Sequence, residues 1–333
     1  MSWISRLNVR RAEGERYLLR RRPVPAIDPS YGDHRLAAVR AAAKEGGAGN
    51  WPGIRAHLAA AEDGEDLTFL VEGLGTVAGV ERWIGDVAAA DPRDALPLLV
   101  SGARHIAWAW HARPRLPVEQ ASAGQWKLFR TRLAVAEEHL FEAAAREPSW
   151  AAPWYFLQVS GRGSEAGEEA AGRRFEEVLR RAPGHLAAYR ERLREHSRAG
   201  GGAQEPMHAF AREAMLAAPP GSPLGQLVAL AHLEEWRETG ADPDSVLMSR
   251  PHVVTALREA ASRSVLHPAF VRRRDWALGF NAFAMAFALA GEYPAAHTVF
   301  RALGDRPTEV PWTYLDERSP LVPFYAWRDR VSR

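Results

Sequence analysis

Two pairs of glutamate and histidine are spaced so that each pair would share one face of a helix. Glu205 and His208 are three residues apart, and so are His232 and Glu235. Residues three apart are neighbours on a helix surface, and helices with this Glu-His spacing can hold metal ions inside bundles. Such a centre also needs further inward-facing carboxylates, and the other glutamates of these segments fall on different helix faces. We therefore expect a surface pair of Glu205 with His208 and no metal site.

A second group of histidines and tryptophans lies within one predicted helix. His105 and His111 flank Trp108 and Trp110. The two histidines are six residues apart, so they do not share one helix face and are not expected to form a zinc pair. Aromatic residues at helical spacing are typical of a packed core. A pocket between the long helices near 95–146, in an enzyme or a small-molecule-binding protein, is the alternative interpretation.

No catalytic motif is recognisable. The chain has no cysteine, which excludes disulfides and a thiol nucleophile. The glycine-rich stretch 161–174 lacks the Gly-Lys-Ser/Thr of a phosphate loop, and it follows a predicted helix instead of a strand. We predict no catalytic residue, cofactor site or metal ligand; whether the protein is an enzyme stays open. Adjacent acidic residues point about 100° apart on a helix and do not converge; these pairs are Glu137 with Glu138, Glu176 with Glu177, and Glu234 with Glu235.

Composition and patterning favour an all-α protein. Of the 333 residues 47% are hydrophobic, and alanine, the strongest helix former, dominates the apolar positions. Long alternating runs of Val, Ile and Thr, which would indicate a sheet, do not occur. The net charge is only +2, so the body of the protein is not an electrostatic match for nucleic acid. The lack of a secretory signal and of about 20 consecutive apolar residues predicts a cytoplasmic location without a transmembrane segment.

Residues 1–30 are predicted to form an arginine-rich N-terminal arm and linker. Seven arginines outnumber three acidic residues there, and Pro23 and Pro25 prevent a continuous helix. The simplest interpretation is a solvated arm. The alternative is an adaptor that uses these arginines to bind an anionic lipid or nucleic-acid surface.

Apolar residues recur at helical spacing from Gly32 onwards. Prolines, glycines and Asn or Asp caps divide this region into separate helices. The dense aromatic residues of the last segment, 311–333, are predicted to pack back onto the preceding helices as a capping tail. The longer predicted helices cover residues 77–90, 95–111, 125–146, 206–216, 224–239, 253–266 and 270–290.

Similar residues recur at an interval of 35 in the middle of the chain, as Leu140, Phe175 and Phe210 do. A period of this size is typical of helical repeats. The order of small, large and proline residues resembles that of tetratricopeptide repeats. The matching positions are Ala136, Leu140, Ala143 and Pro148; Trp154 and Leu157; Ala171, Phe175, Pro183 and Tyr189; and, in a C-terminal copy, Phe280, Phe283, Phe287, Gly291, Tyr293, Ala296 and Phe300.

The resemblance implies an architecture and a function. The architecture is a right-handed α-solenoid of antiparallel hairpins over residues 31–310, with about 13–15 helices in total. In such arrays the first helix of each hairpin lines a concave groove that binds peptides or protein segments. The residues that follow the opening aromatics, Tyr155, Arg190 and Asn281, would face this groove, with Arg194 one turn further on. Because paired arginines suit carboxylates, we expect a non-catalytic interaction module or scaffold whose partner presents an acidic or carboxylate-bearing segment.

Overall fold

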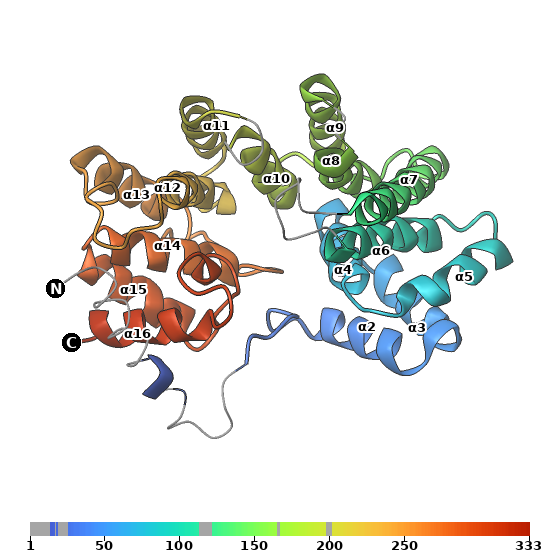
Figure 1. Cartoon of the computed structure of the whole chain (residues 1–333), viewed down its shortest axis with the longest axis horizontal. Coiled ribbons are helices and arrows are strands. Elements are labelled where there is room, and N and C mark those ends of the chain that lie inside the picture. Colours follow the sequence, from blue (N-terminus) through green and yellow to red (C-terminus); the bar gives the residue numbers. More distant parts are fainter. Residues whose placement is uncertain (1–13, 17, 19–25, 113–121, 165–166, 198–201) are drawn as a thin grey trace. The chain divides into compact units, whose positions relative to one another are not determined.

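Every regular element of the described structure is helical (Figure 1). The computed structural model describes residues 14–16, 18, 26–112, 122–164, 167–197 and 202–333. The prediction of an all-α fold is confirmed for these residues. No helix in this part of the chain combines the length and the apolar character that a membrane crossing requires.

The chain divides into two compact units. We call Gly32–Arg192 the N-terminal unit, and Leu193–Arg333, with the described residues before Gly32, the C-terminal unit. The prediction treated residues 31–310 as one domain with a separate tail at 311–333. The boundary between the compact units instead falls within helix α10 (Leu186–His196).

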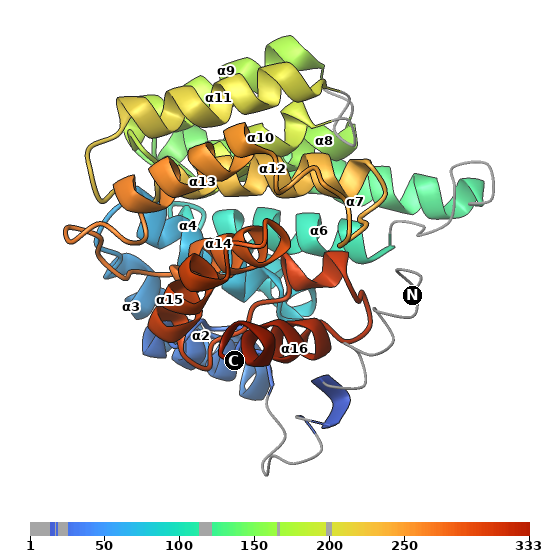
Figure 2. The same cartoon turned by 90° about the vertical axis from the view of Figure 1, so that its left-hand side faces the viewer.

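The helices of the N-terminal unit pack mainly against their neighbours in the chain. α6 packs against α7, α7 against α8, and α8 against α9, while α4 packs against both α6 and α8. The long pair of α6 and α7 lies side by side in both views (Figures 1 and 2). These elements, with the start of α10, are α2 (His34–Glu45), α3 (Trp51–Ala59), α4 (Gly64–Gly75), α5 (Ile84–Ala90), α6 (Leu96–Ala112), α7 (Ala123–Arg146), α8 (Ala152–Ser164) and α9 (Glu168–Arg181).

Helix α6 lies at the centre of this unit because it has almost no polar face. Leu98, Leu99 and Val100 point about 100° apart around the helix axis, and all three are buried. Its one arginine, Arg104, is also buried, and the Nε of Arg104 lies 2.7 Å from the Oε2 of Glu81. Arg104 Nη1 donates a second hydrogen bond of 3.0 Å to the carbonyl of Gly75. These bonds offset the cost of burying the guanidinium. Burial raises the pKa of Glu81, but the hydrogen bond from its own backbone N–H and the interaction with Arg104 outweigh this effect and hold the pKa below its usual range.

Two predicted helices begin later than the sequence pattern indicated. The prediction of one helix over 77–90 is wrong, because Gly79 adopts a φ of 99° and α5 begins only after it. Such a left-handed residue interrupts a right-handed helix. The prediction over 270–290 is wrong for the same kind of reason, since Arg274 has a φ of 51° and α14 begins after it.

The C-terminal unit also packs its helices against chain neighbours. α11 packs against α12, α12 against α13 and α14, and α14 against α15. α15 and α16 lie next to each other in both views (Figure 2). These elements are α11 (Gln204–Ala217), α12 (Gln226–Glu238), α13 (Pro251–Arg263), α14 (Ala277–Leu289), α15 (Tyr293–Leu303) and α16 (Leu321–Val331).

The aromatic residues of segment 311–333 are part of the core of this unit. The rings of Trp312 and Phe324 have centroids 5.5 Å apart, and both pack on Phe300 of α15. The hydroxyl of Tyr325 donates a 2.7 Å hydrogen bond to the carboxylate of Asp305. The tail therefore covers the apolar side of the last helices, as such a cluster of aromatics predicts.

Most of the predicted N-terminal arm lies outside the described residues. Gly14, which is described, is buried against α16, and a side chain there would come within 2.2 Å of the carbonyl oxygen of Val322. This close approach explains why glycine, without a Cβ, fits at this position.

Candidate functional site

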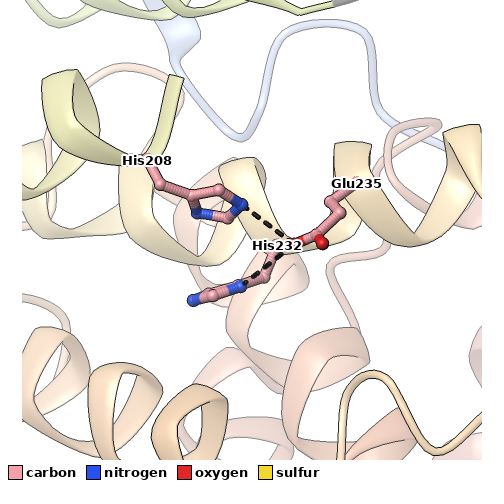
Figure 3. Close-up of side chains that lie close together, drawn as sticks. All are labelled: His208, His232 and Glu235. Carbon is pink, nitrogen blue, oxygen red and sulfur yellow. Dashed lines mark hydrogen bonds and ion pairs between the residues drawn. The ribbon is translucent and has the colours of Figure 1, made fainter. Parts of the chain in front are cut away.

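Two histidines and one glutamate form a cluster that joins α11 to α12 (Figure 3). His208 lies on α11, whereas His232 and Glu235 lie on α12. The Nε2 of His208 is 2.9 Å from the Oε2 of Glu235, and the Nδ1 of His232 is 4.0 Å from the same oxygen. The two imidazole rings have centroids 4.5 Å apart. One nitrogen from each ring and one carboxylate oxygen all lie within 4.8 Å of one another.

The packing of α11 on α12 brings these side chains together. His208 follows the buried Met207 on α11, so it lies at the edge of the buried stripe and is partly accessible. His232 lies between two buried residues of α12, and only 6% of it is exposed. Glu235 is three residues further along and therefore shares the helix face of His232. Both rings and the carboxylate consequently point into the same space between the two helices (Figure 3).

Burial makes His232 a neutral imidazole. Removal from water, together with the neighbouring His208 and His252, lowers the pKa of His232 to about 3. The Nδ1 of His232 is buried and has no hydrogen-bond partner. A buried nitrogen without a partner costs free energy, so a ligand that paired with this atom would stabilise the cluster.

The prediction that Glu205 pairs with His208 is wrong. Glu205 is exposed one turn earlier on α11, and His208 instead contacts Glu235 across the two helices. Glu234, next to Glu235, points elsewhere: it accepts a hydrogen bond from Tyr314 and pairs with Arg237 at 2.7 Å. The Glu-His spacing within each helix could be read from the sequence. The contact between His208 and Glu235 could not be predicted, because it depends on how α11 and α12 pack.

Two of the residues predicted to line a groove are buried in the cores of their units. Tyr155 is 3% exposed; its hydroxyl donates to Glu72 at 2.7 Å and its ring stacks on His185. Asn281 has no exposed surface and accepts a 2.7 Å hydrogen bond from the indole of Trp312. The expectation that both face an open groove is therefore incorrect, because each already satisfies partners inside the protein.

The two predicted groove arginines lie on α10. Arg190 is partly buried and Arg194 is exposed. They are four residues apart, so they share a helix face. A carboxylate-binding role for the pair stays a prediction.

The predicted pocket around His105 is filled by packing. The Nδ1 of His105 donates to the carbonyl of Ser101 at 2.8 Å, and the ring packs edge-on against Trp108 and His139. Burial lowers the pKa of both His105 and His139. Trp108 is covered by the guanidinium of Arg132, 3.6 Å from the ring centre. Trp110 and His111 do not join this group: Trp110 packs on Phe129, and His111 is an exposed residue bonded to its own helix.

A cavity of about 430 Å³ opens elsewhere in the N-terminal unit. Its walls come from α3, the start of α4, the turn before α6, the turn before α8, and the end of α9. Ligand pockets commonly have volumes of about 300–1,000 Å³. The charged and aromatic residues that line it are Arg55, Asp63, Arg93, Asp94, Glu147, Trp150 and Arg181.

Most charges of this cavity are already compensated. The Nε of Arg55 lies 2.7 Å from the Oδ2 of Asp94, and Arg181 pairs with Glu177 on its own helix. The guanidinium of Arg93 is exposed and has no ion-pair partner in the described part of the chain. Arg93 is therefore the cavity cation that can accept an anionic group from outside. No motif in the sequence pointed to it, because its neighbours in the cavity come from five separate segments.

No protein-family model matches the chain, and no curated protein matches it in sequence.

Proposed function

We propose that the protein is an interaction module built as a tetratricopeptide-like solenoid, and that it binds a segment of a partner protein. The support from the fold is the order of packing. In each unit the helices contact mainly the next helix in the chain, as repeat arrays do. Such arrays present extended surfaces to other proteins.

The observation that carries the proposal is the cavity in the N-terminal unit with its uncompensated Arg93. A guanidinium presents two parallel N–H donors, which match the two oxygens of a carboxylate. Arg55 and Arg181 have acidic partners already, so Arg93 is the anchor for the ligand. The half-buried Trp150 in the same cavity offers an apolar surface beside it.

The other charges of the cavity favour a ligand that carries a single carboxylate. Glu147 also lines the cavity, and its negative charge would repel a run of acidic residues. A segment with one carboxylate would satisfy Arg93 without a second charge close to Glu147. The C-terminal end of a polypeptide meets this requirement, and capture of a terminal carboxylate is a recurring mode of peptide recognition.

The test compares short peptides of random sequence with free C-terminal carboxylates and the same peptides with amidated C-termini. Both pools are passed over the immobilised full-length protein, and retained peptide is measured by mass spectrometry. A hydrogen bond to a charged group contributes about 1.5–3 kcal/mol, and about 1.4 kcal/mol is tenfold in affinity. We expect the free acids to be retained at least about tenfold better.

Two variants test whether the free C-terminal carboxylate binds at Arg93. Arg93→Ala should abolish the preference for free acids, whereas Arg130→Ala, which removes an exposed arginine of α7 outside the cavity, should keep it. Equal retention of both pools by the native protein would reject the proposal. So would an unchanged preference in Arg93→Ala.

A further inference from the structure

The cluster of His208, His232 and Glu235 has the donor set of a metal site. Two imidazole nitrogens and one carboxylate oxygen converge from α11 and α12 (Figure 3). Zinc is commonly bound by these donors, at about 2.0–2.2 Å from each atom. This cluster is in the C-terminal unit, so it is independent of the peptide cavity proposed above.

The distances between the donors fit one ion. At a metal–ligand distance of about 2.1 Å, two ligands of a tetrahedral ion are about 3.4 Å apart. The two measured nitrogen–oxygen separations, 2.9 and 4.0 Å, lie on either side of that value. The two imidazole nitrogens lie within 4.8 Å of each other, so an ion would require the carboxylate oxygen and the rings to shift toward a common centre. Rotation of the partly exposed His208 and Glu235 side chains can supply this movement.

The unpartnered Nδ1 atom of His232 is an independent indication that this cluster binds a ligand. His232 is more than nine-tenths buried, and its Nδ1 faces Glu235 without a hydrogen-bond partner. A metal ion would satisfy this buried nitrogen, which the protein alone leaves unpaired.

Glu235 is also available for a cation. In the described residues its carboxylate pairs with the two histidines only, and no arginine or lysine neutralises it. The adjacent Glu234, by contrast, is held by Arg237 and Tyr314. The difference between these neighbouring glutamates leaves one negative charge directed at the two imidazoles.

We propose that His208, His232 and Glu235 bind one divalent transition-metal ion, with Zn²⁺ as the best-matched ion, and that this ion clamps α11 to α12. Two imidazoles and a carboxylate suit zinc better than the harder magnesium or calcium ions, which prefer oxygen ligands. Three protein ligands leave one position of a tetrahedral ion for water or a further ligand. Binding requires the lone pair of His208 Nε2, so the proton that this nitrogen shares with Glu235 has to move to Nδ1.

The test is a calorimetric titration of the full-length protein with Zn²⁺, after treatment with a chelator and removal of the chelator. We expect one tight site per chain. His208→Ala and Glu235→Gln should each weaken that site by at least about 10–100-fold, because even loss of a group that only orients a ligand costs this much. The midpoint of thermal unfolding of the native protein should rise with Zn²⁺, because the ion binds only the folded arrangement of α11 and α12.

Glu205→Gln is the matched control. Glu205 is on the same helix as His208, at the spacing that the sequence first suggested for a pair, but it is exposed and outside the cluster. This variant should bind Zn²⁺ as the native protein does. Circular dichroism checks that all variants are folded, and the partly exposed positions of His208 and Glu235 make folded variants attainable.

Three results would overturn the proposal. One is the absence of a tight site in the native protein, which would leave an interhelical hydrogen bond between His208 and Glu235. Another is native affinity in both His208→Ala and Glu235→Gln, which would assign the ion to other histidines among the 12 in the chain. The third is an equal loss of affinity in Glu205→Gln.

Discussion

Asn281 illustrates how a polar residue in a helix can serve the core instead of a ligand. Its amide nitrogen donates to the carbonyls of Ala277 and Arg306, at 2.8 and 3.0 Å, and its oxygen accepts from Trp312. The residue thereby ties α14 to the segment that precedes α16. The resemblance to tetratricopeptide repeats predicts that Asn281 faces a groove, because it follows the opening aromatic Phe280. Its partners lie 25 and 31 residues away, beyond what helical spacing can reveal.

We predict that Asn281→Ala destabilises the protein by about 2–4 kcal/mol, because it leaves both the Trp312 indole and the Arg306 carbonyl without a buried partner. The free energy of unfolding is measured by urea titration. Thr298→Ala is the control: Thr298 is exposed and bonds only within its own helix, so its change should stay within about 0.5 kcal/mol. Similar stability of Asn281→Ala and the native protein would show that this network contributes little.

The contact between α6 and α7 depends on a residue without a side chain. A Cβ at Gly102 would lie 2.5 Å from the Cγ of Leu140, which is fully buried and cannot move aside. Gly102 therefore lets the two helices approach closely. The amphipathic pattern predicted both helices almost to their observed ends, 95–111 for α6 and 125–146 for α7. It did not identify Gly102 as the contact, because the pattern of one helix carries no information about its neighbour.

We predict opposite effects of the same substitution at two helical glycines. Gly102→Ala should destabilise the protein by about 1–3 kcal/mol through overpacking. Gly172→Ala should stabilise it by about 0.5–1 kcal/mol, because a Cβ at Gly172 of α9 meets nothing within 4 Å and alanine favours the helix. Urea titrations of both variants give the comparison. If both substitutions increased the free energy of unfolding, helix propensity, and not packing, would dominate at Gly102.

The division into two compact units is the largest feature that the repeat pattern did not predict. The N-terminal unit is one continuous stretch with its own core around α6. The C-terminal unit combines residues from both ends of the chain, including the buried Gly14. The interval of 35 continues from Leu140 through Phe175 to Phe210, and the glycines at 200–202 interrupt the array. The boundary between the units lies before these glycines, inside α10, where the spacing gives no sign of it.

We predict that a fragment of residues 32–196, which keeps α2 to α10 intact, folds without the rest of the chain. A compact stretch with its own hydrophobic core can in general fold alone. Circular dichroism should show a helical spectrum, and urea should unfold the fragment in one cooperative transition. A fragment that unfolds gradually would mean that the N-terminal unit needs the remaining residues for its stability.

Local rules of spacing were enough to assign this chain to the all-α class and to locate most of its helices. Helical periodicity, proline and glycine breaks and the scarcity of β-branched runs all act within a few residues, so they can be read along the chain. The environment of each functional candidate could not be obtained in this way. Tyr155 and Asn281 are buried, whereas His208 meets Glu235 and Arg93 enters a cavity. Each outcome depends on which helices pack together, and distant segments of the chain decide that packing.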